Sequence, residues 1–371
     1  MLVLAWALAV TGLPDCLSIT GGALVIPANV TEIPDNKYEG CYEITSLTFE
    51  ANSNLTTIGE KAFKDTKIAG ALEIPANVEI IKKQAFLDTD ISSLTFEANS
   101  NLNTIGKETF HIPTLVGALE IPANVVTIEE DAFYETAITS LTFASGSKLE
   151  TIGVQSFGEC QQLTGPIQIP ANVVTIKNDA FYNTAITGLT FEINSGLETI
   201  EDSAFESAES LTGPVVIPSS VTTIGLQSFR KTAITSIDFP ESVASFGYSV
   251  FKECLNLSRV IVRGNLSLDS DNLDRLILSL CDNSNNQICV EGNGTGAAAI
   301  FDNFNYQSYG DCELAACTPT PSPTANPTAQ PTYDNSPVPP PETKNDGTWV
   351  MLGPMLGFLG VSIGFSLYLL V

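Results

Sequence analysis

Apolar residues recur along the chain in one triad: an apolar residue, Ile three positions later, and an aromatic residue five positions after that. The triads are Val30-Ile33-Tyr38, Leu55-Ile58-Phe63, Val78-Ile81-Phe86, Leu102-Ile105-Phe110, Val125-Ile128-Phe133, Leu149-Ile152-Phe157, Val173-Ile176-Phe181, Leu197-Ile200-Phe205, Val221-Ile224-Phe229 and Val243-Phe246-Phe251. Successive aromatic residues lie 22 to 25 positions apart, which is a period typical of solenoid repeats. A unit of this length cannot bury its own apolar face, so it must stack on copies of itself.

Two sub-types of repeat alternate along the chain. One begins Gly-Ala-Leu-x-Ile-Pro-Ala-Asn-Val, as at residues 70–78, and the other begins Ser-Leu-Thr-Phe, as at residues 46–49. Both openings alternate apolar with polar residues, which indicates a strand with Leu47, Phe49, Leu72 and Ile74 facing inward. We predict about 10–11 coils with one short parallel strand each. A tight turn or short helical piece should then carry each aromatic residue into the core.

The repeated pattern Ile-Pro-x-x-Val-x-x-Ile-x-x-x-Ala-Phe resembles the BspA-like class of leucine-rich repeats. Val125-Val126-Thr127-Ile128 followed by Ala132-Phe133 is a close match. The resemblance covers about two thirds of the chain and implies an α/β-type solenoid, mostly β, wound as a leucine-rich repeat superhelix. It also implies a surface protein that acts in adhesion or ligand binding, and it carries no catalytic residues that could be transferred.

The net charge of the chain limits the classes of partner that it can bind. The chain has 42 acidic and 16 basic residues, a net charge of −26 and one histidine. A strongly acidic protein lacks the basic footprint that nucleic-acid binding needs. It is also repelled by anionic lipid, and it attracts cations or basic proteins.

The first residues resemble a secretory leader. An apolar run over residues 2–11 is followed by Gly, Pro and Asp, so we predict a signal peptide at 1–18 and the solenoid at 19–264. Five Asn-x-Ser/Thr tripeptides fit a secretory route and are candidates for N-glycosylation. They begin at Asn29, Asn54, Asn256, Asn265 and Asn293.

Seven of the eight cysteines form two groups, and Cys16 lies in the predicted signal peptide. Cys41, Cys160 and Cys254 occupy the slot three residues after the repeat aromatic, where other coils have Thr, and we interpret them as buried free thiols. The disulfide candidates Cys281, Cys289, Cys312 and Cys317 follow the last repeat. Because an exposed solenoid end needs a cap, we predict a disulfide-stapled cap at 265–317, with three pairings open.

The C-terminal part has a different composition. Residues 318–348 are rich in Pro, Thr and Ser, which predicts a disordered, extended stalk. Residues 349–371 contain no charged residue and are long enough as a helix to span a bilayer. This terminal apolar helix is either a retained transmembrane anchor or a glycolipid-anchor signal that is removed.

The outward strand positions give the candidate binding surface. One column reads Thr48, Glu73, Thr95, Glu120, Thr142, and the next column contains Glu50 and Glu97 alternating with prolines. The alternation keeps like carboxylates two coils apart, beyond the spacing of about 4.8 Å between adjacent strands. We predict that these seven residues bind an extracellular protein or polysaccharide; the plainer interpretation is a solvated face on an acidic protein.

Other chemistry is weakly supported by the sequence. We predict no cofactor, although calcium could bind the carboxylates if a ligand completed its shell of six to eight oxygens. The Asp269, Asp271 and Asp274 run departs from a calcium loop because Leu273 breaks the alternation. His111 lacks a nucleophile context. The expected function is therefore cell-surface recognition or adhesion on a membrane-anchored solenoid, with a glycosylated structural coat as the alternative and an enzyme third.

Overall fold

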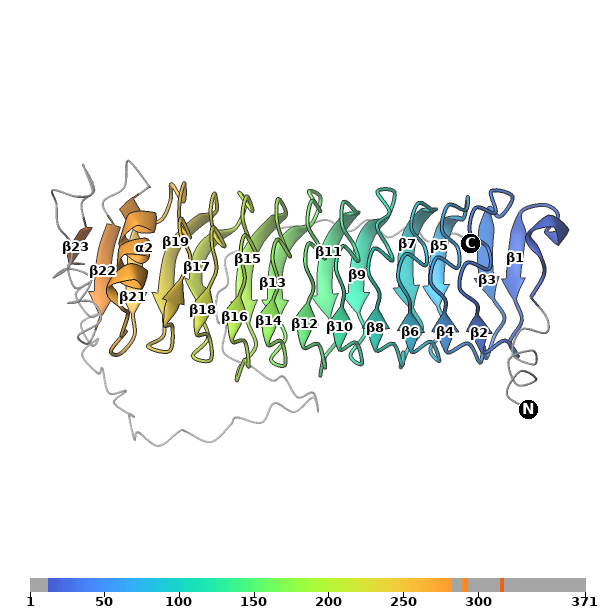
Figure 1. Cartoon of the computed structure of the whole chain (residues 1–371), viewed down its shortest axis with the longest axis horizontal. Coiled ribbons are helices and arrows are strands. Elements are labelled where there is room, and N and C mark those ends of the chain that lie inside the picture. The colour runs from blue at the N-terminus through green and yellow to red at the C-terminus, as the bar shows by residue number, and fades with distance from the viewer. Residues whose placement is uncertain (1–12, 282–287, 293–313, 317–371) are drawn as a thin grey trace, which may run out of the picture. The chain divides into compact units, whose positions relative to one another are not determined.

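The computed structural model describes residues 13–281, 288–292 and 314–316, and shows a stack of coils (Figure 1). Each coil has one longer strand on a common side. These strands are β1 (Ala23–Ile26), β3 (Ser46–Phe49), β5 (Ala69–Ile74), β7 (Asp90–Phe96), β9 (Val116–Ile121), β11 (Ala137–Phe143), β13 (Thr164–Ile169), β15 (Ala185–Phe191), β17 (Thr212–Val216), β19 (Ala233–Phe239) and β21 (Arg259–Val262). All their pairings are parallel. The predicted solenoid with a short parallel strand in every coil is confirmed.

Each coil up to the tenth also has a two-residue strand, which the prediction did not include. These are β2 (Glu32–Ile33), β4 (Thr57–Ile58), β6 (Ile80–Ile81), β8 (Thr104–Ile105), β10 (Thr127–Ile128), β12 (Thr151–Ile152), β14 (Thr175–Ile176), β16 (Thr199–Ile200), β18 (Thr223–Ile224) and β20 (Ser245–Phe246). They form one continuous 10-stranded sheet in which the triad Ile residues stack inward. This second sheet explains why Thr-Ile recurs at a fixed place in the repeat.

The longer strands do not form one continuous sheet. They pair as β1-β3, β5-β7, β9-β11 and β13-β15, and the last sheet runs β17-β19-β21-β22-β23. The boundaries between these sheets, which we call seams, lie between β3 and β5, β7 and β9, β11 and β13, and β15 and β17. A new sheet begins after each seam, with β5, β9, β13 or β17. Each of these four strands contains a Gly with φ of +80° to +91°, and the register shifts beside it. The pairing therefore follows the two alternating sub-types of repeat.

The aromatic residue of each coil lies in a turn, which settles the prediction of a turn or short helical piece. Residues two positions before and after the aromatic have positive φ and are mostly not glycine, for example Lys61 at 52° and Asp65 at 56°. This conformation points alternate N–H groups at the next coil. Phe63 N donates to Ala85 O at 2.8 Å, and Asp65 N donates to Leu87 O at 3.0 Å. The turns thus form a third hydrogen-bonded side of the solenoid.

The core is a ladder of stacked rings flanked by aliphatic ladders. From Tyr38 to Phe251, successive ring centroids are 5.1 to 6.0 Å apart and nearly parallel. Every ring of the ladder is fully buried. Thr66, three residues after Phe63, donates its hydroxyl to the Phe63 carbonyl at 2.8 Å, which satisfies a buried polar group.

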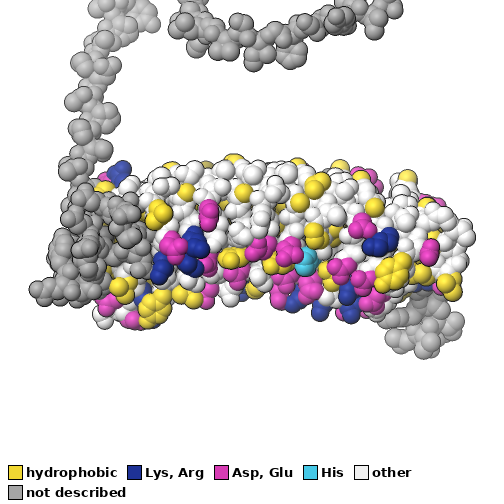
Figure 2. Space-filling model, turned by 90° about the horizontal axis from the view of Figure 1, so that it is seen from above, with side chains coloured by type: hydrophobic (Ala, Val, Ile, Leu, Met, Phe, Trp, Pro, Cys, Tyr) yellow, Lys and Arg dark blue, Asp and Glu magenta, His cyan; other side chains and the backbone are white. Residues whose placement is uncertain are grey.

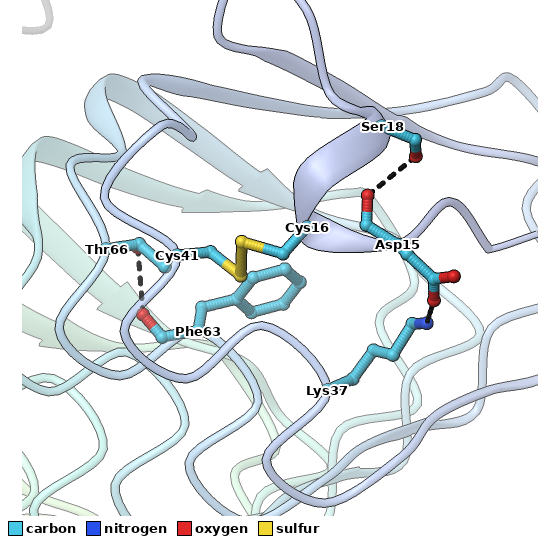
Figure 3. The surroundings of a disulfide bond; sticks show 7 residues. All are labelled: Asp15, Cys16, Ser18, Lys37, Cys41, Phe63 and Thr66. Atoms are coloured by element: carbon cyan, nitrogen blue, oxygen red, sulfur yellow. Dashed lines mark hydrogen bonds and ion pairs between the residues drawn. A yellow bond between two sulfur atoms is a disulfide. The ribbon is translucent and has the colours of Figure 1, made fainter.

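A disulfide closes the N-terminal end of the stack (Figure 3). The short helix η1 (Cys16–Ser18) lies over the first coil, and Cys16 bonds to Cys41 with their Cα atoms 5.8 Å apart. Our interpretation of Cys41 as a free thiol was wrong, because its partner comes from the N-terminal segment and not from another coil. A leader that ended at Ser18 would remove Cys16, so the predicted boundary at 18 and this disulfide exclude each other.

The C-terminal end contains a helix that the sequence analysis missed. Helix α2 (Ser270–Cys281) follows β21, and β22 (Ile288–Gly292) and β23 (Leu314–Ala316) extend the last sheet. Asp269 caps the helix by accepting the Asn272 N–H at 2.8 Å, and Asp271 pairs with Arg275. These aspartates therefore begin a helix and do not form a calcium loop.

Several predicted features lie outside the described residues, including the stalk, residues 349–371 and Cys312 and Cys317. Cys289 is disulfide-bonded. The chain divides into a unit of residues 1–318 and a second unit of residues 319–371. Among the helices that the structure describes, none is long and apolar enough to cross a membrane.

Candidate binding surface on the strand face

The outward side of the longer strands, which we call the strand face, presents the predicted columns as exposed side chains. Thr48, Glu73, Thr95, Glu120 and Thr142 are all exposed. Glu73 lies in register with Thr95, and Glu120 lies in register with Thr142. Each pair therefore places a carboxylate beside a hydroxyl on adjacent strands of one sheet.

The second predicted column has a structural role that the sequence did not reveal. The carboxylates of Glu50 and Glu97 accept the backbone N–H groups of Ala28 and Ala76, each at 2.9 Å. Glu192 does the same for Ala171. Each glutamate thus satisfies a main-chain donor in the turn that follows the strand of the preceding coil. The sequence analysis placed Glu50 and Glu97 in the candidate site, but the fold already uses one carboxylate oxygen of each.

The first column is different, because its carboxylates are free. Within the described part of the chain, no hydrogen bond or ion pair involves the side chains of Glu73 and Glu120. The same holds for the hydroxyls of Thr48, Thr95 and Thr142. Free carboxylates held in register by a parallel sheet can accept hydrogen bonds from a partner or attract a cationic group. The structure therefore divides the seven predicted residues into five available groups and two partly occupied ones.

Metal binding by these residues alone is not supported by their spacing. No group of three or more His, Cys, Asp or Glu side chains in the described residues is arranged to hold a metal ion. Glu73 and Glu120 lie two coils apart, about 10 Å at the usual strand spacing. A calcium ion at one of them would need oxygens from a bound ligand.

The single histidine lies on the turn edge, where the aromatic turns of successive coils meet. Figure 2 shows it in cyan beside acidic side chains. His111 Nε2 is 3.3 Å from Glu135 Oε2, and the His111 ring packs edge-on against Tyr134 at 5.2 Å. Burial, and then the charges of Glu135 and Glu159, raise the pKa of Tyr134. These contacts give His111 an acidic and an aromatic neighbour, and neither is a serine or cysteine nucleophile.

The structure also contains a groove that the sequence analysis did not find. It lies on the strand face at the seam between β15 and β17 and has a volume of about 500 Å³. Phe191, Val216 and Arg263 are among its lining residues. The sequence signal here was Val216, which occupies the position in its repeat that Glu73 and Glu120 occupy in theirs.

Four of the predicted glycosylation sites are accessible. Asn29, Asn54, Asn256 and Asn265 are exposed, and Asn293 lies outside the described residues. Asn29 and Asn54 occupy the same place in adjacent coils, three residues before the paired Glu32 and Thr57. Accessibility is the condition that glycosylation requires of the folded chain.

Comparison with known proteins gives a family match. The model for the BspA type leucine rich repeat region matches in six copies, over residues 31–164 and 126–258. Among curated proteins, none matches this sequence.

Several solved structures are similar to this chain. The pneumococcal vaccine antigen PcpA is 17% identical with a TM-score of 0.47, and the match covers 80% of this chain and 79% of that one. A leucine rich cell surface protein from Faecalibacterium prausnitzii is 21% identical with a TM-score of 0.40, covering 73% and 79%. A leucine-rich repeat protein from Eubacterium ventriosum is 21% identical with a TM-score of 0.41, covering 74% and 73%.

Proposed function

The chain belongs to the BspA-type leucine-rich repeat family, and we propose that it is a non-catalytic recognition or adhesion protein whose strand face contacts an extracellular protein or polysaccharide. The solenoid is the scaffold, and the cell surface is its location. A leader, the proline-rich stalk and the apolar segment 349–371, retained or exchanged for a glycolipid, would deliver and anchor it there.

One observation carries this proposal. The carboxylates of Glu73 and Glu120 have no partner within the described residues, although Glu50 and Glu97 on the same face bond to the backbone. Carboxylates that the fold does not use remain available to a partner. The free carboxylates beside Thr95 and Thr142 offer acceptors at fixed spacing to basic side chains, to sugar hydroxyls, or to calcium completed by a ligand.

The experiment measures binding of the full-length chain to the producing cells' own surface and extracellular polymers, with and without calcium. The test variant is Glu73→Gln with Glu120→Gln. The matched control is Glu50→Gln with Glu97→Gln, which removes the same charge while Gln still accepts the backbone N–H. The proposal is supported if binding is saturable and its affinity falls about tenfold or more in the test variant alone. This magnitude follows because hydrogen bonds to charged groups contribute about 1.5–3 kcal/mol each.

Two other outcomes would contradict the proposal. Equal loss in both variants would mean that net charge, and not this site, attracts the partner. Absence of binding under either condition would favour the second candidate, a structural coat. The observation behind that candidate is that the short strands β2 to β20 form one continuous ladder and the turns form another, with the longer strands adding pairs between the seams, which makes a stiff spacer.

A further inference from the structure

The groove at the seam between β15 and β17 is lined by both apolar and polar side chains. Phe191, which is only partly buried, and Val216, which is 51% exposed, contribute apolar surface together with Pro214. Because β15 and β17 belong to different hydrogen-bonded sheets, no strand ladder joins them in the described part of the chain. An apolar surface beside free polar groups is typical of small-molecule pockets, and about 500 Å³ is within their usual range.

Arg263 forms the fixed wall of this groove. It follows β21, two coils beyond β17, and its side chain reaches back across the strand face. Its Nε donates to Asp238 at 2.7 Å, and its Nη2 donates to the Ile217 carbonyl at 2.6 Å. A guanidinium held on two sides is preorganised, and its Nη1 group has no partner within the described residues.

The opposite side of the groove supplies an acceptor. Glu192 uses Oε2 for the Ala171 N–H and leaves Oε1 available. Asn194 is exposed beside it and offers both a donor and an acceptor. The rim therefore has a donor at Arg263 and an acceptor at Glu192. Pro214 and Val216 are exposed on β17, and Phe191 packs against the core with part of its surface accessible.

The charge balance of the groove selects among ligands. Asp238 already neutralises Arg263, and Glu192 adds one negative charge, so an anionic ligand is disfavoured. A cationic ammonium group offers only donors, so it cannot accept a hydrogen bond from the Nη1 group of Arg263. A neutral ring with an apolar face and several hydroxyls suits all of these groups, because its face packs on Phe191 and Val216 while its hydroxyls reach the rim.

We infer that this groove is a binding site for one neutral hexopyranose unit of a glycan. The sugar ring lies against Phe191 and Val216, accepts a hydrogen bond from Arg263 and donates one to Glu192. The inference rests on the proposed function only in placing recognition on the strand face. It uses residues separate from Glu73 and Glu120.

The test is binding of defined sugars to the full-length chain by saturation-transfer NMR. The probes are methyl glucoside, methyl mannoside, methyl galactoside and N-acetylglucosamine, with glucuronate and glucosamine as the charged comparisons. For a single ring in an open groove, a Kd of roughly 1 mM is expected. At least one neutral sugar should bind, and the charged sugars should bind more weakly.

The test variant is Val216→Glu, which places in the groove the residue that the same column has at Glu73 and Glu120, so the fold should tolerate it. The matched control is Val25→Glu, which changes a residue of similar exposure, 48%, on β1 far along the same column. We expect Val216→Glu to weaken sugar binding about tenfold or more, by occupying the groove with a charge, and Val25→Glu to leave it unchanged.

Three results would overturn the inference: no binding of any neutral sugar, preference for a charged sugar, or equal binding by wild type and Val216→Glu. The experiments distinguish a failure of the groove inference from a failure of the proposed function. Loss of cell-surface binding in the Glu73→Gln, Glu120→Gln variant would support the wider function whatever the sugars do. Sugar binding that survives in that variant would support the groove on its own.

Discussion

At the scale of single residues, chemically identical glutamates on one face have different roles. Glu97 accepts the Ala76 N–H at 2.9 Å, whereas Glu120 has no partner within the described residues. We expect Glu97→Ala to lower the free energy of unfolding by about 1 kcal/mol, since it leaves a turn N–H without its partner. Glu120→Ala should leave stability within about 0.5 kcal/mol of wild type. Urea unfolding of both variants checks this, and equal losses would contradict it.

The two remaining repeat-slot thiols, Cys160 and Cys254, should make stability depend on alkaline pH. Burial raises the pKa of Cys160 to about 12 and that of Cys254 to about 11, from an ordinary value of 9.0. The folded chain therefore keeps thiol protons that the unfolded chain releases. Their contribution is fully present below about pH 9 and is lost as pH rises towards 11 to 12, by up to about 1.4 kcal/mol per pH unit for each thiol.

The measurement compares the urea midpoint of wild type with that of Cys160→Thr, Cys254→Thr from pH 8 to 11. Threonine occupies this slot in other coils, as Thr66 shows, so the variant should fold. Lysine and tyrosine titrations are common to both proteins and cancel in the difference. We expect the wild type to lose more stability than the variant across this range; parallel curves would mean that the thiols do not contribute.

At the scale of elements, the disulfide holds η1 on the first coil. It closes a loop of 25 residues, for which chain entropy gives a stabilisation of about 3 kcal/mol. The variant Cys16→Ser, Cys41→Thr should lose about this amount, and hydrogen exchange should increase first in β1 and β2. Uniform exchange along the whole stack would contradict this local role.

The same disulfide makes a prediction about processing. Since the bond needs Cys16, we expect any leader to be cut before Cys16 and not after Ser18. Mass spectrometry of the secreted chain under non-reducing conditions checks this directly. A mature chain that begins after Ser18 would show that the disulfide does not form.

The elements also show what sequence periodicity can and cannot predict. The alternation of Leu47 with Thr48 predicted the strands and their exposed face, because side chains in a strand alternate with period two. The turn ladder was not predictable, since residues such as Lys61 and Asp65 adopt positive φ only where the next coil accepts their N–H groups. Helix α2 was missed because a single short helix has no repeat to reveal it.

At the scale of the whole molecule, the sequence predicted the solenoid because its triads recur in every coil. The candidate site was predicted in part. Exposure of Glu73 and Glu120 followed from the pattern, but the partner of Glu97 and the groove beside Arg263 depend on contacts between residues of different coils. Such contacts follow from how the coils stack, which a column of residue names does not specify.

The stacked aromatic rings predict how the solenoid should unfold when one ring is removed. Phe157 is fully buried between Phe133 at 5.3 Å and Phe181 at 5.5 Å, in the middle of the stack. Phe157→Ala should lower the free energy of unfolding by about 3–5 kcal/mol through the cavity it leaves. Because coils contact only their neighbours, this loss should divide the solenoid into two blocks that unfold separately.

The matched control is Tyr38→Ala at the end of the ladder, where the ring stacks on Phe63 alone at 5.5 Å. Removing an end ring should fray the first coil and leave one cooperative transition for the rest. Urea unfolding with hydrogen exchange distinguishes the two variants: two steps and faster exchange around residues 133–181 are expected for Phe157→Ala only. A single transition with uniformly faster exchange in both variants would mean that coupling extends beyond neighbouring coils and that the solenoid unfolds as one body.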